Sequence, residues 1–137
     1  MTNTVNAVYR EGMHFSVDVN GHTIEIDASE KSGGQNLGPS PKIFMLLSLA
    51  GCTGFDIVSM LKKMRVEFSD FSVRVDGNLT DGEPSVYDQA LIRYSIKLDK
   101  DNQGKMERAV SMSKNKYCGV SRMFESFAKV DFEIVYL

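Results

Sequence analysis

The chain has 137 residues, of which 42% are apolar and 25% are charged, and its net charge is −2. This length predicts one domain over residues 1–137, and the composition is that of a soluble globular protein. The charge argues against nucleic acid or an anionic membrane as a partner, since either needs a basic face. The start, MTNTVNAVYREG, resembles no signal peptide, and the longest apolar run, Ile43 to Phe55, is too short to span a bilayer. We therefore expect a cytoplasmic protein with no membrane association.

The first third of the chain predicts a hairpin followed by an irregular loop. Apolar and polar residues alternate on both sides of Asn20–Gly21, a dipeptide that favours a tight turn because both of its positions adopt positive φ. The alternating apolar residues are Met13, Phe15, Val17, Val19, Ile24 and Ile26. A weaker pattern predicts an earlier strand over Thr4–Arg10. Residues 29–41 are rich in Gly, Ser and Pro and predict a loop.

A long helix is predicted from Pro41 to Arg65. Ser40 suits the N-cap and Pro41 the first turn, and the cations at the other end complement the helix dipole. The first half of this helix is apolar almost all round, so we expect it to be buried on every side. A small sheet covers only one side of a helix. The pattern therefore predicts a homodimer whose second subunit covers the rest.

The remainder predicts two antiparallel strands, two shorter helices and a final strand. The strand patterns centre on Phe71–Val75 and Ala90–Leu98, and the last lies in 129–137. The helices fall in 101–116 and 117–128, the second with Val120, Met123, Phe124 and Phe127 facing inward. Because the strands come in hairpins, the fold class is α+β, with a mostly antiparallel sheet and a long central helix.

Only Cys52 and Cys118 are candidates for chemistry. Cys52 lies in the long helix between Gly51 and Gly54, which leave room for a close approach. Cys118 lies at the start of a short helix near Lys114 and Lys116, where the helix N-terminus should lower its pKa. Free cysteines are also common as inert core residues. The separation, 118 − 52 = 66 residues, matches neither a CxxC motif nor a zinc pattern, so we expect no metal and no cofactor.

The stretch GPSPKIFMLLSLAGCTGFDIVSMLKKMR resembles the central helix of the OsmC/Ohr family of osmotically inducible and organic-hydroperoxide-resistance proteins. AVSMSKNKYCGVSRMF resembles the segment that carries the family's second cysteine, and the resemblance extends from Val17 to the C-terminus. It implies an intertwined homodimer. It also implies that Cys52 is the peroxidatic thiol and Cys118 the resolving thiol of an organic hydroperoxide reductase. An external dithiol would reduce the resulting disulfide.

The chain departs from the family pattern around the motif proline. The hydroperoxide reductases place a glutamate just after it, which orients an arginine that activates the thiolate, whereas Lys42 and Ile43 follow Pro41 here. Arg10 and Lys42 are the possible accessory cations. Two hypotheses follow: a thiol-dependent peroxidase, or a non-enzymatic dimer that binds an apolar small molecule at its interface.

Overall fold

The computed structural model describes all 137 residues and divides them into two compact units, Met1–Met45 and Leu46–Leu137. The first unit contains an antiparallel sheet of three strands in the order β1 (Asn6–Tyr9), β2 (Phe15–Val19) and β3 (His22–Ile26). Asn20 and Gly21 join β2 to β3 with φ of 49° and 79°, so the predicted hairpin is confirmed.

Asp27, which follows β3, organises the loop after this sheet. Its carboxylate accepts hydrogen bonds from the backbone N–H groups of Ala28, Gln35 and Leu37 at 2.7, 3.1 and 3.2 Å. Within the loop, Glu30–Ser32 forms a short 3₁₀ helix, η1. The loop predicted from its Gly, Ser and Pro content is thus ordered around one side chain.

The second unit is built on a sheet with the strand order β4 (Phe68–Leu79), β5 (Tyr87–Leu98) and β6 (Lys129–Tyr136). β4 and β5 are antiparallel, and β6 is parallel to β5. The α+β class with mostly antiparallel pairing is confirmed, although the strands form two small sheets. The connection from β5 to β6 consists of η2 (Lys100–Asn102), α2 (Gln103–Met112), the π-helical segment η3 (Ser113–Tyr117) and α3 (Gly119–Glu125).

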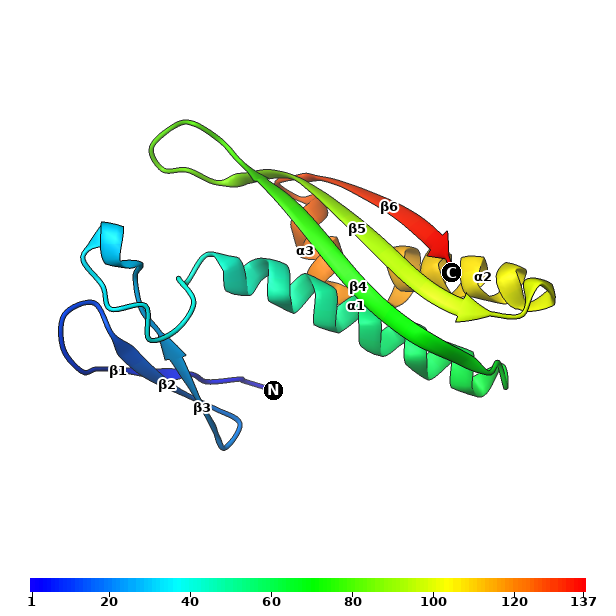
Figure 1. Ribbon diagram of the computed structural model, residues 1–137, viewed down its shortest axis with the longest axis horizontal. Helices are drawn as coiled ribbons and strands as arrows, with labels where there is room; N and C mark the ends of the chain where they lie inside the picture. The colour runs from blue at the N-terminus through cyan, green and yellow to red at the C-terminus, as the bar shows by residue number, and fades with distance from the viewer. The chain divides into compact units, whose positions relative to one another are not determined.

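The long helix α1 (Ile43–Lys63) begins two residues after Pro41, and it packs with α2 and α3 along the β4–β5–β6 sheet (Figure 1). Alternate residues of β5 face these helices, from Ala90 to Ile96. The buried apolar core comprises Leu49, Ile57, Leu61, Val66, Tyr87, Ala90, Ile92, Tyr94, Ile96, Met106, Ala109, Val110, Phe124 and Val130. The period of two in β5 therefore places its apolar residues on one helix-covered face.

Burial of α1 is one-sided within the chain. Leu49, Thr53, Ile57 and Leu61 are fully buried, whereas Leu47 is 61% exposed and Phe55 is 81% exposed. The sheet and the shorter helices thus cover one side of α1, and cover of the other side by a second subunit stays a prediction. The prediction for α3 needs correction, because Val120 and Phe124 pack on the core while Met123 and Phe127 are exposed.

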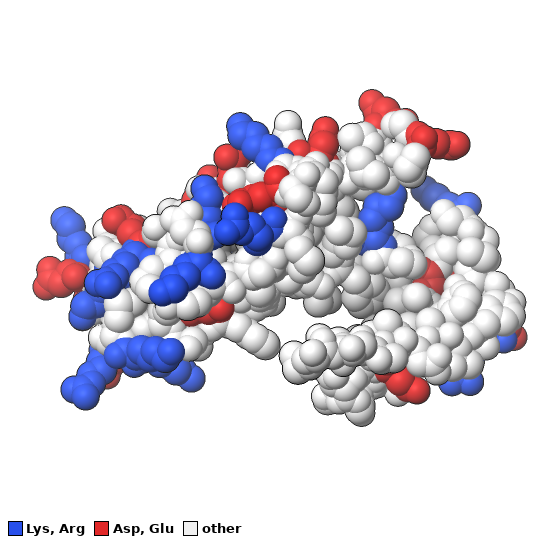
Figure 2. Space-filling model, turned by 180° about the vertical axis from the view of Figure 1, so that it is seen from behind, with Lys and Arg blue, Asp and Glu red and all other residues white.

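The surface carries charges of both signs. Acidic side chains are interspersed among the basic ones on the face shown in Figure 2. By length and composition alone, the 21 residues of α1 could cross a membrane. The core helix of a soluble protein passes the same test, and α1 contributes Leu49, Ile57 and Leu61 to the core of the second unit.

Candidate active site

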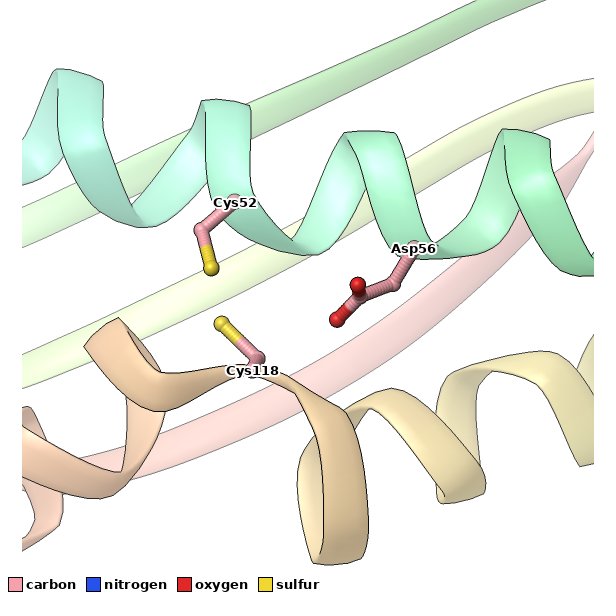
Figure 3. A group of neighbouring side chains, drawn as sticks. All are labelled: Cys52, Asp56 and Cys118. Carbon is pink, nitrogen blue, oxygen red and sulfur yellow. The ribbon is translucent and has the colours of Figure 1, made fainter.

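The two cysteines and Asp56 form a cluster in the second unit. Cys52 and Asp56 are four residues apart on α1 and therefore share a face, and Cys118 comes from the N-cap of α3. One donor atom of each residue, the two sulfurs and a carboxylate oxygen, lies within 4.8 Å of the others. Figure 3 shows the sulfurs pointing toward one another between α1 and the segment before α3, with the Asp56 carboxylate directed into the same space.

Cys118 is held in place by the backbone around it. Its N–H donates to the Ser113 carbonyl at 2.9 Å, which closes the π-helical segment. Its Sγ accepts the Ser121 N–H at 3.3 Å, so the thiol itself caps α3. The side chain is 3% exposed, whereas Cys52 is partly exposed. The predicted position at a helix start is therefore confirmed.

The predicted acidity of Cys118 is wrong in sign. Burial raises the pKa of its thiol to about 12, and the neighbouring Cys52 thiol and the Asp56 carboxylate raise it as well. The Ser121 N–H at the helix N-terminus lowers this pKa, as expected, but the removal of water outweighs it. Lys114 and Lys116 have other partners, since their Nζ atoms lie 4.8 and 5.2 Å from the ring centres of Phe132 and Tyr117.

A buried chain of hydroxyl groups supports Asp56 from the core side. Ser113 Oγ donates to Asp56 Oδ2 at 2.9 Å and lies 3.0 Å from Thr53 Oγ1, which is hydrogen-bonded to the Tyr94 hydroxyl. Thr53, Ser113 and Tyr94 are fully buried. Burial raises the pKa of Tyr94 to about 12, so its hydroxyl stays neutral at physiological pH. The sequence analysis identified none of the four residues of this network as part of the site. Asp56 could have been identified, because it follows Cys52 by four residues on the same helix.

The accessory candidates Arg10 and Lys42 belong to the first unit. Arg10 Nε donates to Ser16 Oγ at 3.0 Å, and Ser16 donates to Glu25 Oε2 at 2.7 Å. His14 pairs with the same carboxylate. Lys42 lies exposed in the turn before α1. Arg10 is thus part of a polar network between strands, and a role for either cation at the cysteines stays a prediction.

The donor atoms that the cluster offers are two thiols and one carboxylate. Two thiols this close can be oxidised together to a disulfide, giving up two electrons. The same three groups could also hold a metal ion, since sulfur and oxygen are both common ligands of zinc. The arrangement contains no further histidine, cysteine or acidic ligand.

Residues 33–133 match the model of the OsmC-like protein family. The chain is 28% identical over 128 residues to protein YhfA of Escherichia coli K12, covering 91% of this chain and 92% of that protein. An OsmC-like protein of unknown function from Vibrio cholerae has the same fold, with a TM-score of 0.82 and 13% identity over 98% of this chain and 99% of the other. So does an organic hydroperoxide resistance protein from Legionella pneumophila, with a TM-score of 0.69 and 14% identity over 98% and 97%. The family match covers most of the sequence, and the chain belongs to the OsmC-like proteins.

Proposed function

We propose that the protein is a thiol-dependent peroxidase that reduces organic hydroperoxides, with Cys52 as the peroxidatic and Cys118 as the resolving cysteine. The observation that carries this proposal is the approach of the two sulfurs, within 4.8 Å of one another inside one unit of one chain. Structural neighbours from Legionella pneumophila and Elizabethkingia anophelis are described as organic hydroperoxide resistance proteins, which supports this choice of substrate.

The reaction proceeds in two balanced steps. The Cys52 thiolate attacks one peroxide oxygen, an S–O bond forms, the O–O bond breaks, and the departing alkoxide takes a proton to become an alcohol. Cys118 then attacks the sulfur of the Cys52 sulfenic acid. An S–S bond forms, the S–O bond breaks, and the departing hydroxide combines with the Cys118 proton to give water. An external dithiol returns both thiols by exchange.

Exposure and acidity support this division of roles. Cys52 is partly exposed and can meet a hydroperoxide, whereas Cys118 is buried. Burial first, and then the Cys52 sulfur, raise the pKa of Cys118 to about 12, which keeps this thiol protonated in the resting protein.

The proposal includes an intertwined homodimer in which residues 1–137 act as one domain. Leu47, Gly51 and Phe55 are spaced four residues apart on the exposed face of α1. A side chain added at Gly51 would meet nothing within 4 Å, so this face offers space for a second helix. We place the protein in the cytoplasm, where a dithiol reductant is available, with Arg10 and Lys42 as accessory cations.

The test is a titration of the reduced protein with one equivalent of cumene hydroperoxide, with thiols counted before and after. Both thiols should disappear within seconds. Cys52→Ser should abolish turnover, while Cys118→Ser should react once and leave a sulfenic acid on Cys52 that a specific probe and mass spectrometry locate. Label on Cys118 in the Cys52→Ser protein, with none on Cys52 in the other variant, would reverse the assignment.

The exposed apolar face of α1 also favours the second hypothesis, a dimer that binds an apolar small molecule. The same titration separates the two. If neither variant takes up the sulfenate probe and the wild-type thiols survive the hydroperoxide, the binding function replaces the peroxidase. Alanine variants of Arg10 and Lys42, assayed for the rate of thiol loss, test the two accessory cations.

A further inference from the structure

We infer that reduced Cys52, Asp56 and Cys118 form a binding site for a thiophilic divalent cation of the Zn²⁺ class. The site comprises two sulfurs and one carboxylate oxygen, all within 4.8 Å of one another. The inference is drawn from this geometry alone, and it does not depend on whether the thiols react with hydroperoxides.

The donor set is suited to zinc. Zn²⁺ binds four ligands in a tetrahedron, with Zn–S bonds of about 2.3 Å and Zn–O bonds of about 2.1 Å, which places two sulfur ligands about 3.8 Å apart. The three donor atoms lie within 4.8 Å of one another, so each pair is at most about 1 Å farther apart than these bonds require. Hard cations such as Mg²⁺ and Ca²⁺ prefer all-oxygen sites, and two thiolates therefore select against them. Three protein ligands leave the fourth position to water or to an external ligand.

Hydrogen bonds from Ser113 and Ser121 hold two of the three ligands in place. Ser113 Oγ donates to Asp56 Oδ2 at 2.9 Å, and this bond leaves the other carboxylate oxygen available to a metal. The Ser121 N–H donates to Cys118 Sγ at 3.3 Å. Ser113 and Ser121 are both fully buried, so water does not compete for these contacts. Hydrogen bonds of this kind orient metal ligands and strengthen binding.

Metal binding and disulfide formation exclude one another at this cluster. Zn²⁺ binds cysteine as the thiolate, so coordination uses both sulfurs as thiolates and releases protons. A disulfide uses the same two sulfurs and leaves neither as a thiolate ligand. The reduced protein therefore binds the cation, the oxidised protein does not, and the bound cation shields both thiols from oxidants and alkylating reagents.

The experiment titrates reduced, metal-free protein with Co²⁺ under argon and then displaces the Co²⁺ with Zn²⁺. We expect one Co²⁺ per chain, sulfur-to-cobalt charge-transfer bands in the near ultraviolet, the visible bands of a tetrahedral complex, and release of protons. Wild-type protein whose thiols have been joined with diamide or alkylated with N-ethylmaleimide should show none of these signals. These measurements on wild-type protein do not depend on any variant folding.

Two variants test the carboxylate. Ser113→Ala removes the hydrogen bond that orients the Asp56 carboxylate and should weaken Zn²⁺ binding by about 10- to 100-fold, and Asp56→Asn should weaken it at least as much. Asp81→Asn, in the loop between β4 and β5, removes the same charge away from the cluster and should leave the affinity unchanged. The site is refuted if charge-transfer bands do not form, if binding persists in alkylated protein, or if folded Asp56→Asn protein keeps wild-type affinity.

Discussion

The two units of the chain are stabilised in different ways. Every fully buried apolar side chain lies in the second unit, Leu46–Leu137, whereas the buried residues of the first are the polar Ser16 and Asp27. The first unit presents its apolar residues around an open hollow of about 190 Å³, lined by Val17, Val19, Ile24, Ile26, Pro41 and Phe44. The second unit therefore has a buried apolar core of its own, and the first unit does not.

This difference explains where the candidate chemistry lies. A small sheet of short strands is stabilised when a helix or another layer packs on its apolar face. A close-packed core, in contrast, fixes side chains in single conformations. The two cysteines and Asp56 lie against the core of the second unit, with Thr53 and Ser113 fully buried beside them. The rigid unit thus carries the reactive groups, and the first unit is the part that we expect to gain order from assembly.

The largest effect should come from opening the core of the second unit. Ile57 is fully buried on α1, and Ile57→Ala should lower the free energy of unfolding by about 2–5 kcal/mol, because it loses transfer energy and leaves a cavity. Urea denaturation followed by circular dichroism measures this change. Ile24→Ala is the matched control in the first unit, and an equal loss there would show that both units share one core.

The next largest effect should be on assembly. Phe55 is 81% exposed on α1, so Phe55→Glu should leave the second unit folded while it abolishes the proposed dimer, because a charge would be buried at the interface. Sedimentation velocity at micromolar concentration separates monomer from dimer. Lys63→Glu places the same side chain at the end of the helix and should remain dimeric. A Phe55→Glu protein that stays dimeric would place the interface elsewhere.

A smaller and more local effect should follow from neutralising Asp27. Burial pulls the pKa of its carboxyl upward, but the N–H groups of Ala28, Leu37 and Gln35 outweigh it, and the net shift is downward. A lowered pKa in the folded state stabilises the loop above the ordinary pKa of an aspartate, and this contribution is lost as the pH falls through the folded value. Asp27→Asn should therefore expose residues 28–38 to proteolysis at neutral pH.

Hydrogen exchange of the same loop tests the pH dependence. In the wild type, protection of the Gln35 and Leu37 amides should fall below pH 4 while protection of β5 persists. Glu25 should also stabilise the first unit less as the pH falls. Its pKa is lowered by the Ser16 hydroxyl and then by His14, so its stabilisation is also lost in acid. If the loop and β5 lose protection together, the two units do not respond to pH separately.

The smallest effect is expected at Ser121. Its hydroxyl is buried without a hydrogen-bond partner, so Ser121→Ala removes an unsatisfied group and should leave stability unchanged or slightly higher. Ser113→Ala is the contrasting variant, since it takes a partner from both Thr53 and Asp56 and should cost about 1–3 kcal/mol. Thermal unfolding of both variants checks this order. A large loss in Ser121→Ala would reveal a partner for that hydroxyl.

The sequence was informative wherever a local rule decides the structure. The Asn20–Gly21 turn, the period of two in β5 and the position of Cys118 at a helix start were all predictable. Features that depend on tertiary packing could not be predicted from the sequence. The high pKa of Cys118 results mainly from burial by distant segments, which no local pattern contains. The network behind Asp56 joins residues that are 41 to 60 positions apart, and its hydroxyl side chains carry no motif.

The position of Cys118 within the connection from β5 to β6 has a topological consequence. Because these strands are parallel, the chain must return along the whole sheet, and Cys118 lies on that return path. A bond from Cys118 to Cys52, which are 118 − 52 = 66 positions apart, would close a covalent ring that includes the β4–β5 hairpin and α2. In the chain-entropy model, such a ring removes enough freedom from the unfolded chain to stabilise the fold by about 4 kcal/mol. Oxidation of these two sulfurs would then raise the melting temperature of the second unit.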